Sequence, residues 1–550
     1  MHQSNFLTFF IILEVFTFLY TFRFYQAAGR KAWEAAIPVY KTYVLLKIIK
    51  RPTWQIFLFF IPVVSNLMTL VALYELLHVF NYRKWKDFWT SVITLGGYLL
   101  YLQLSTQLRY VGRDNAYIKK HVGETLNSLV FAVVVASVLR AFTFEAYVIP
   151  TPSMEKTLLV GDFLFVSKMH YGNRLTITPL SIPLMHSKIP LLNFDCFVDW
   201  VQLPYIRLPK FQDIKRFDNV VFNWPMESDL PIDKRMNYIK RCVGLPGDTL
   251  EIIDRELIIN GQKPTYPDRT RLQFEYFVRT NGAPFNKRIL HDKLDIYYSK
   301  DLVPGENDFS QVRQINQNEY LVFIPEDKVD QFKSLPNVEE VIPVIAPREP
   351  GSYESNAPLV LKNYIDRYLV PNSEMFPNRF HSDIIKYANT RDNYGPVYIP
   401  KKGATVQISP DNIEWYERII SVYEGNELQV TDSLIYINGK QADSYTFKQN
   451  YYWMMGDNRH NSLDSRYWGF VPEDHIVGKP VFIWMSYDKT AEKLTDRIRT
   501  KRVFTTVHGE GKPRSYFWHF VVVVAVLNLL WKYVIKKIRD KKRNLPEKTI

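Results

Sequence analysis

The feature that most limits the fold of this chain is a set of apolar segments long enough to cross a bilayer. A membrane-spanning helix needs about 20 mostly apolar residues. Aromatic residues bracket the last of these segments at both ends, as interfacial anchors do. The segments lie at residues 6–22, 54–79, 88–104, 125–144 and 516–535. The sequence therefore predicts a membrane-anchored protein, with the lipid bilayer as a partner.

Segment 6–22 is followed by Gln26 and the small residues Ala27, Ala28 and Gly29, a pattern that can indicate a cleavable signal peptide. It lacks the basic stretch that precedes such a peptide, so we interpret it as a helix that stays in the protein. Glu14, Glu75 and Arg140 lie within or near the apolar segments. Charges there are costly and often functional. A helix–helix contact or a side chain that reaches the interface is the more ordinary explanation for each.

The net charge of +13 is compatible with nucleic acid, a membrane surface or topology signals. The basic residues gather beside the apolar segments, at 23–51, 109–120 and 536–543, which favours topology over nucleic acid. Placing these clusters in the cytoplasm puts the N-terminus and residues 145–514 outside. The loop with Arg83, Lys84 and Lys86 disagrees. Oligomeric state stays open.

Cysteine usage excludes little. The chain has Cys196 and Cys242, far apart and without a CxxC motif. This count argues against a disulfide scaffold or a zinc site and leaves one possible bridge. No metal or cofactor is expected.

The segment 145–514 is predicted to be mostly β. Short apolar or alternating runs are separated by Gly, Pro, Asn and Asp, and no amphipathic helical period is expected to interrupt them. These runs lie at 218–222, 236–243, 250–259 and 481–484. Two hairpin-like stretches, 250–261 and 428–439, resemble each other and end in Asn-Gly, but one echo does not establish a repeat.

Ser153 is the first candidate for chemistry. It lies in the run Pro150-Thr151-Pro152-Ser153, nine residues beyond Phe144 at the end of an apolar segment. Nine extended residues reach at most about 30 Å, which keeps this serine near the outer membrane surface. The prolines favour an extended approach. A lone serine in such a loop is usually a turn residue, and as a nucleophile it needs a base.

Lysine is the candidate base, because none of the 11 His falls in a triad motif and no G-x-S-x-G elbow occurs. A lysine works as a base only when burial lowers its pKa from about 10.4 towards 7–8. Lys240 fits, since strand alternation puts Tyr238 and Cys242 on its face. The alternative is a strand-edge lysine that reaches solvent.

A third stretch, 454–469, carries two Asp–Arg sets in a loop with Gly, Asn and Ser. Bidentate Arg–carboxylate pairs would give the loop a fixed geometry, and a serine there would orient a lysine amine. The alternative is an ordinary polar turn with surface ion pairs, which contribute little.

Together these stretches resemble the bacterial type I signal peptidase (leader peptidase) family. The motifs occur in the family's order and cover about 145–265 and 445–490. The matching residues are 150–154 with Thr157 and Leu158, then 238–241 and 243–248, then 456–459, 461–462, 464–466 and 468–469, followed by 471–472 and 478–479.

The resemblance implies a serine endopeptidase that cleaves signal peptides from exported preproteins after small residues. Ser153 would attack the scissile carbonyl and Lys240 would take its proton. The backbone N–H of Ser153 and the hydroxyl of Thr151 would form the oxyanion hole. Ser462 would orient Lys240, with support from Asp464 and Arg466. The residues that would line the substrate pockets are Tyr147, Ile149, Met154, Leu158, Tyr238 and Ile239.

The apolar segments and the placement of the basic residues predict a multi-pass protein of the inner or plasma membrane, although the resemblance does not account for the early apolar segments. The resemblance implies a β-rich catalytic domain outside the membrane, on the periplasmic or other extracytoplasmic face. The predicted parts are a multi-span region (1–110), a cytoplasmic loop and anchor helix (111–144), a first catalytic part (145–266), an inserted β-rich subdomain (267–444), a second catalytic part (445–514), and a transmembrane helix with a basic cytoplasmic tail (515–550).

The sequence departs from the family pattern at a few points. Pro152 stands where many members have Gly or another small or polar residue, and His460 stands where Asp is common. These departures bear on fine substrate preference. The insertion exceeds the layout of smaller members, and its residues 267–427 carry no recognisable chemistry.

The location of Ser153 agrees with signal peptide cleavage, because the cleavage site of a signal peptide emerges where its apolar region leaves the bilayer. One alternative is a repressor-type Ser/Lys protease, against which the apolar segments argue. Another is a polytopic envelope binding or transport protein with a non-catalytic external domain. A third is an inactive scaffold, although Ser153, Lys240 and Ser462 are all present.

Overall fold

The computed structural model describes residues 2–189, 192–297, 311–349, 351–353, 357–369, 373–380, 386–431, 434–489, 491 and 494–543. The chain forms two compact units. The first contains 1–145, 168–212 and 223–237, and the second contains 146–167, 213–222 and 238–550. The side chains of Lys119 and Lys120, and those of the basic residues 536–543 used to predict the orientation, lie outside the described part.

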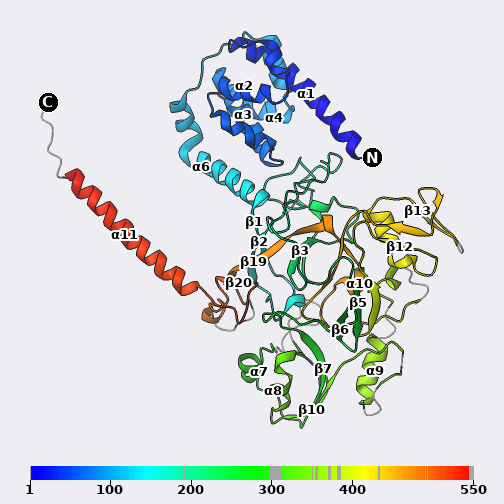
Figure 1. The fold of residues 1–550 in the computed structure, drawn as a ribbon. Helices are drawn as coiled ribbons and strands as arrows, with labels where there is room; N and C mark the ends of the chain where they lie inside the picture. The colour runs from blue at the N-terminus through cyan, green and yellow to red at the C-terminus, as the bar shows by residue number, and fades with distance from the viewer. Residues whose placement is uncertain are drawn as a thin grey trace. The chain divides into compact units, whose positions relative to one another are not determined.

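The first unit is built around helices (Figure 1). Its core packs aromatic and aliphatic side chains such as Phe24, Leu46, Leu76 and Phe80. Its helices are α1 (His2–Ala27), α2 (Tyr40–Ile48), α3 (Val64–Val79), α4 (Trp85–Ile93), α5 (Gly97–Ser105) and α6 (Asn115–Phe142), with 3₁₀ turns at Ala32–Ala35 and Thr53–Phe60.

The prediction of one transmembrane helix over 88–104 is wrong. The segment forms α4 and α5, of nine residues each, and the chain turns between them at Leu95 and Gly96, both with positive φ. Gly96 takes this conformation without the penalty of a Cβ. A nine-residue helix is about 14 Å long, roughly half the thickness of the hydrocarbon core.

The single helix predicted over 54–79 is also wrong. A 3₁₀ stretch, Thr53–Phe60, is followed by Pro62 and by Val63 with positive φ, and α3 begins only at Val64. Proline lacks an amide hydrogen and disfavours a helical conformation in the residue before it, so the helix is interrupted there. The helix α6 ends at Phe142, two residues before the end of the predicted segment 125–144, and its apolar part is Ser128–Phe142.

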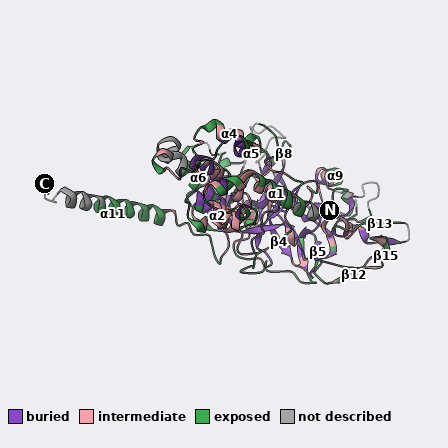
Figure 2. Cartoon of the chain, turned by 90° about the horizontal axis from the view of Figure 1, so that it is seen from above, coloured by how far each residue is buried: buried purple, intermediate pink, exposed green. Residues whose placement is uncertain are grey.

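Among the described residues, Leu7–Ala27 of α1 and Phe517–Val534 of α11 (Phe517–Arg543) are the stretches long and apolar enough to cross a bilayer. None of the α11 stretch is buried, and Figure 2 shows its described residues almost entirely exposed. The coarse prediction of a mainly β protein with apolar helices at both ends is therefore confirmed. The number of crossings and the orientation stay predictions.

The charged residues near the apolar segments make ion pairs within the protein. Glu14 joins two helices, as the ordinary explanation predicted, Glu75 joins a helix to two loop residues, and Arg140 joins a helix to a strand. The ion pairs are Glu14 with Lys41 at 2.7 Å, Glu75 with Arg51 at 2.7 Å and with Arg113 at 3.1 Å, and Arg140 with Glu145 at 2.6 Å. Each of these charges is thus neutralised within the first unit.

The second unit contains a sheet with the strand order β1-β2-β19-β3-β4-β17-β18, to which β20 adds beside β19. The predicted strands at 218–222, 236–243 and 481–484 are confirmed as β3, β4 and part of β19. The bounds are β1 (Phe144–Val148), β2 (Asp162–Ser167), β3 (Asn219–Asn223), β4 (Asn237–Gly244), β17 (Tyr451–Met455), β18 (Val471–Pro472), β19 (Ile476–Ser486) and β20 (Thr505–Thr506).

The second unit also contains smaller antiparallel sheets. The predicted hairpin at 250–259 is confirmed, with a two-residue turn at Asp254 and Arg255, both at positive φ as a type I′ turn requires. The second hairpin-like stretch also forms strands, although its Asp432 lies outside the described residues. The strands are β5 (Thr249–Ile253), β6 (Glu256–Ile259), β11 (Tyr394–Tyr398), β12 (Thr405–Gln407), β13 (Leu428–Val430), β14 (Ile435–Ile437), β15 (Lys440–Gln441) and β16 (Ser444–Thr446).

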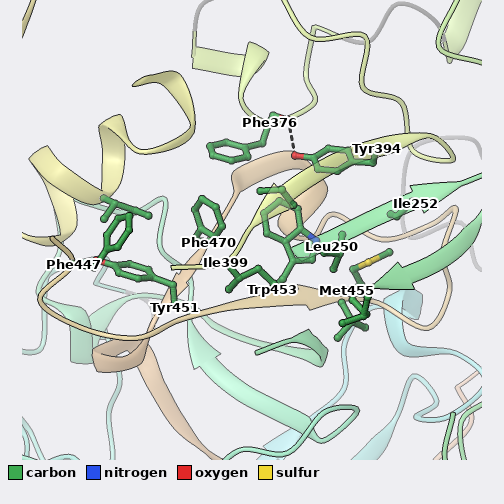
Figure 3. Packing of buried hydrophobic residues seen from close by; sticks show 14 of the residues in the cluster. Leu250, Ile252, Phe376, Tyr394, Ile399, Phe447, Tyr451, Trp453, Met455 and Phe470 are labelled. Atoms are coloured by element: carbon green, nitrogen blue, oxygen red, sulfur yellow. Dashed lines mark hydrogen bonds between the residues drawn. The ribbon is translucent and has the colours of Figure 1, made fainter. Parts of the chain in front are cut away.

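An aromatic core holds β17 in place (Figure 3). Trp453 is fully buried, with ring centroids 5.5 Å from Tyr394 and 5.4 Å from Phe470. The Tyr394 hydroxyl donates to the carbonyl of Phe376 at 2.6 Å, so this buried polar group is satisfied. Because β17 ends at Met455, this core fixes the point at which the following loop begins.

The inserted segment forms a sheet of strand order β10-β7-β9-β8 with short helices. The expectation that no amphipathic helix interrupts 145–514 is wrong, since α7 buries Leu290 and Leu294, and α9 buries Leu361 and Ile365. Each helix is too short for its period to stand out from the surrounding polar sequence. The bounds are β7 (Gln273–Thr280), β8 (Val312–Asn316), β9 (Glu319–Pro325), β10 (Val338–Pro343), α7 (Lys287–Leu294), α8 (Val329–Lys333) and α9 (Leu359–Tyr368).

Candidate active site

Lys240 lies inside the main sheet of the second unit. Its strand, β4, has β3 on one side and β17 on the other, and Lys240 is only 3% exposed. The alternative of a strand-edge lysine that reaches solvent is therefore excluded. The strand is buried from Lys240 to Gly244, so the ammonium group is held away from water.

Ser153 and Lys240 meet in this buried position. The Lys240 Nζ lies 2.8 Å from the Ser153 Oγ and 3.0 Å from the carbonyl oxygen of Ile239. Ser153 is 8% exposed and belongs to a single 3₁₀ turn, Pro152–Met154. The Tyr238 ring lies next to the Lys240 amine, with its centroid 5.4 Å from Nζ, as strand alternation predicted. The two groups are within reach of a proton transfer.

The environment of Lys240 favours its neutral form. Burial lowers the pKa of Lys240 to about 8, although Asp464 and Asp457 act to raise it. A group with a pKa near 8 is neutral in about a tenth of the molecules at pH 7, compared with less than one in a thousand for a solvated lysine. Among the described residues, Lys240 makes no ion pair that would hold its charge.

A second buried lysine lies close in sequence to Ser153 but has different hydrogen-bond partners. Lys156 donates to the side-chain oxygen of Gln311 at 3.0 Å and lies 3.6 Å from a carboxylate oxygen of Glu155. Burial lowers the pKa of Lys156 as well. The Ser153 hydroxyl is hydrogen-bonded to Lys240, so Lys240 is the better candidate for the base of Ser153.

The loop that follows β17, residues 456–466, is named here the Gly456 loop. Asn458 of this loop donates from its backbone N–H to the Ser153 carbonyl and from its side chain to the Pro152 carbonyl, both at 3.1 Å. A Cβ at Gly456 would lie 2.5 Å from the Ser153 carbonyl oxygen and 2.6 Å from the Cβ of Ser462. Only glycine at 456 therefore allows the Pro152–Met154 turn and Ser462 to lie this close to the loop backbone.

One of the predicted Asp–Arg sets forms within the loop. Arg466 makes a bidentate pair with Asp464 at 2.8 and 2.9 Å, and a carboxylate oxygen of Asp464 also accepts the Gly456 N–H at 3.1 Å. Burial alone would raise the pKa of Asp464, but Arg466 and the Gly456 N–H lower it below its usual range. Asp464 therefore stays ionised and holds the two ends of the loop together.

The other set does not form within the loop. Asp457 pairs instead with Arg241 of β4, at 2.5 and 2.7 Å, with both side chains buried. Arg459 donates to the hydroxyl of Tyr266 at 3.0 Å. The Asp457–Arg241 pair ties the loop to the residue next to Lys240.

The remaining predicted residues lie nearby with different environments. Ser462 is 8% exposed, and its hydroxyl has no hydrogen-bond partner among the described residues. Thr151 is exposed and directly precedes the Pro152–Met154 turn. The orienting role of Ser462 and the oxyanion role of Thr151 both stay predictions.

The residues predicted to line the substrate pockets mostly gather in one apolar cluster. Ile149, Met154 and Leu158 are buried in it, and Tyr147 and Ile239 pack against it. Tyr238 lies apart from this cluster, with its ring against Phe222 and Trp468. The cluster includes Met154 of the 3₁₀ turn that carries Ser153, and the substrate-pocket role of these residues stays a prediction.

Sequence reasoning did not assign Gly456, Asn458, Asp457 or Arg241 to the site, although all of them fall within its quoted motifs. The available signal was the density of polar and small residues in 456–466, which a buried loop needs to satisfy its own backbone. The two cysteines, Cys196 and Cys242, are buried free thiols.

Comparison with known proteins agrees with this geometry. The family described as signal peptidase, peptidase S26, matches residues 122–329 and 359–485, more than half of the chain. Residues 33–113 match a separate family of unknown function.

Similar proteins carry the name signal peptidase I. That of Buchnera aphidicola subsp. Schizaphis graminum is 28% identical over 388 residues, which cover 70% of this chain and 82% of the relative. That of Buchnera aphidicola subsp. Acyrthosiphon pisum is 27% identical over 368 residues, 66% of this chain and 76% of the relative. That of Haemophilus influenzae is 45% identical over 69 residues, 12% of this chain and 20% of the relative. Because the family model matches more than half of the chain, the chain belongs to the type I signal peptidase family, peptidase S26.

Proposed function

We propose that this protein is a membrane-anchored serine endopeptidase that cleaves signal peptides from preproteins with a Ser153–Lys240 dyad. The observation that carries the proposal is the 2.8 Å distance between the Lys240 Nζ and the Ser153 Oγ in a buried position. The family and the name of its relatives support signal peptide cleavage. The dyad supplies the chemistry that such cleavage needs.

In this mechanism the neutral amine of Lys240 takes the proton of the Ser153 hydroxyl as the oxygen attacks the scissile carbonyl. The resulting ammonium then gives a proton to the leaving amine. The acyl-enzyme is hydrolysed by water, which Lys240 deprotonates in the same way. Burial of Lys240 keeps its pKa close to the working pH, so it can act in both directions.

The oxyanion of the tetrahedral intermediate would bind the backbone N–H of Ser153 and the hydroxyl of Thr151. A donor of this kind is typically worth about 3 kcal/mol of transition-state stabilisation. Ser462 would turn its hydroxyl to the Lys240 amine, while Asp464 and Arg466 hold the loop that carries it. The unsatisfied hydroxyl of Ser462 is compatible with this role.

Substrate preference would come from the apolar cluster around the nucleophile turn. Because Ile149, Met154 and Leu158 fill this space, only small side chains next to the scissile bond would fit. Tyr147 and Ile239, partly buried at its border, would contact the extended substrate. The bilayer would hold the protein through α1 and α11, with the second unit on the outer face.

The test is cleavage of a panel of preproteins by the purified chain in detergent, with sequencing of the new N-termini. Ser153→Ala and Lys240→Ala should each abolish cleavage, with circular dichroism spectra like that of the wild type. Lys263→Ala is the matched control, because this lysine is exposed and pairs with Glu256 on the surface. Normal cleavage by either dyad variant would refute the proposal.

A further inference from the structure

The Gly456 loop is held from the side opposite the nucleophile by the inserted segment. Gln273 of β7 donates its N–H to the Asp457 carbonyl and accepts the Arg459 N–H, both at 3.0 Å. Gln273 is fully buried. The loop therefore contacts Pro152 and Ser153 on one side and the first strand of the insertion on the other.

His460, in the middle of this loop, connects two separate parts of the insertion. Its side chain is fully buried. The Nδ1 atom accepts the backbone N–H of Glu275 on β7 at 3.2 Å, and the Nε2 atom lies 2.6 Å from the Oδ1 of Asp392. One imidazole thus joins the loop to β7 and to the turn that precedes β11.

These contacts determine the protonation of the ring. An Nδ1 that accepts an N–H carries no proton, so the proton of the neutral ring is on Nε2, which donates to Asp392. Burial lowers the pKa of His460 to about 4, and nearby Arg391 contributes, so the neutral form persists over the physiological range. The His460 imidazole therefore links its two partners by hydrogen bonds and does not act as an acid or base.

This arrangement explains why a histidine is present where an aspartate is common in the family. An aspartate at 460 could accept the Glu275 N–H but could not donate to Asp392. It would also place a second carboxylate next to a buried one, which is unfavourable. The histidine at 460 and the aspartate at 392 therefore form a matched pair.

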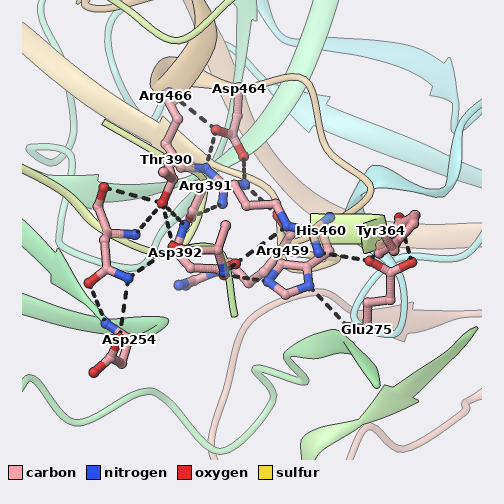
Figure 4. Close-up of polar contacts among 12 residues, drawn as sticks. Asp254, Glu275, Tyr364, Thr390, Arg391, Asp392, Arg459, His460, Asp464 and Arg466 are labelled. Atoms are coloured by element: carbon pink, nitrogen blue, oxygen red, sulfur yellow. Dashed lines mark hydrogen bonds and ion pairs between the residues drawn. The ribbon is translucent and has the colours of Figure 1, made fainter. Parts of the chain in front are cut away.

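The same turn also contacts the far end of the loop (Figure 4). The Arg391 carbonyl accepts from Arg466 at 2.9 Å, and the Arg391 guanidinium pairs with Glu275 at 2.7 Å. Arg466 holds Asp464, whose charge acts on Lys240. A continuous set of buried polar contacts thus runs from the insertion to the surroundings of the dyad.

We propose that His460 is a positioning residue through which the inserted segment holds the Gly456 loop, and with it Ser462 and Asp464, in register with Lys240. The inference rests on the proposed dyad function and assigns the insertion a part in it. The apolar cluster that contains Ile149, Met154 and Leu158 includes none of these polar residues. Loss of His460 should therefore affect turnover more than substrate binding.

The experiment measures kcat and KM of the full chain in detergent on a preprotein that the wild type cleaves. His460→Ala should lower kcat by at least about tenfold with KM changed less than about twofold, as expected when a supporting contact is lost but the binding surface remains. His291→Ala is the matched control, because His291 pairs with Asp292 on the exposed surface of the insertion. It should behave as the wild type.

Two further variants keep the test decisive if His460→Ala is unstable. His460→Gln can still donate to Asp392 and should recover a measurable part of kcat. Asp392→Asn keeps only one side-chain oxygen, which cannot accept both the His460 Nε2–H and the Ala346 N–H that Asp392 accepts, so it should lower kcat in the same direction as His460→Ala.

A His460→Ala variant with kcat within twofold of the wild type would overturn the inference. So would equal loss in His460→Ala and His460→Gln with kcat and KM changing together. Either result leaves the dyad intact if Ser153→Ala is inactive, whereas a wild-type chain that cleaves no preprotein refutes the proposed function and the inference with it.

Discussion

Two regions of the molecule bury charged groups in opposite ways. In the helical unit, Glu75 is surrounded by Arg51 and Arg113 at 2.7 and 3.1 Å, so its charge is compensated. In the second unit, Lys240 is just as inaccessible, but its close contacts are a hydroxyl and a carbonyl. Compensated burial keeps a group charged and serves packing, whereas uncompensated burial shifts a pKa and is typical of catalytic groups.

The sharpest way to break this comparison is to remove the uncompensated charge without removing volume. Lys240→Met should lower kcat/KM by at least about a thousandfold, because the nucleophile loses its base. It should also make the second unit more stable at pH 7.

The sign of the stability effect follows from the pKa values. The pKa of Lys240 is about 8 in the folded protein and 10.5 in the unfolded chain, so folding is penalised wherever the lysine is protonated in both states. The full penalty, about 3 kcal/mol, applies below pH 8 and disappears above pH 10.5. Thermal unfolding of the wild type and Lys240→Met at pH 7 and near pH 10.5 measures it. If the wild type and Lys240→Met differ in unfolding free energy by the same amount at both pH values, Lys240 is not buried without a compensating charge.

A smaller effect is expected from Asp464, the carboxylate that raises the pKa of Lys240 most. Asp464→Asn should lower kcat by about a hundredfold, because Arg466 loses its buried counter-charge and the Gly456 loop loosens. Asp464 raises the pKa of Lys240, so the acidic limb of the activity profile should move to lower pH. A matching pH profile in wild type and variant would show that Asp464 does not act on the dyad.

The smallest effect on cleavage is expected in the helical unit. Glu75→Gln should leave kcat/KM within about twofold of the wild type. It should lower the stability of the unit by about 1–2 kcal/mol, because Arg51 and Arg113 lose their partner but remain partly solvated. Limited proteolysis of residues 1–145 reports on this change. A loss of cleavage comparable with that of Asp464→Asn would mean that compensated charges also serve the reaction.

The parts of the site that sequence reasoning predicted correctly are those set by local pattern. Alternation in β4 placed Tyr238 on the face of Lys240. The prolines predicted an extended approach to Ser153, whereas Ser153 itself lies in a 3₁₀ turn, Pro152–Met154. The Asp464–Arg466 pair, two residues apart, was predictable for the same reason.

What could not be predicted depends on pairing over long distances. Asp457 pairs with Arg241, 216 residues earlier in the sequence, instead of with its neighbour Arg459. His460 finds Asp392 only because the insertion folds back onto the loop. In the helical unit, hydropathy could not reveal that the chain turns at Leu95 and Gly96, since the sequence is apolar on both sides of that turn.

The dependence of kcat/KM on pH tests the role of Lys240 most directly. Only the neutral amine can accept the Ser153 proton, so activity should fall about tenfold per unit below a pKa near 8 and level off above it. The Lys263→Ala control should give the same curve. A profile that is flat from about pH 6 to about pH 9 would contradict a lysine base at this site.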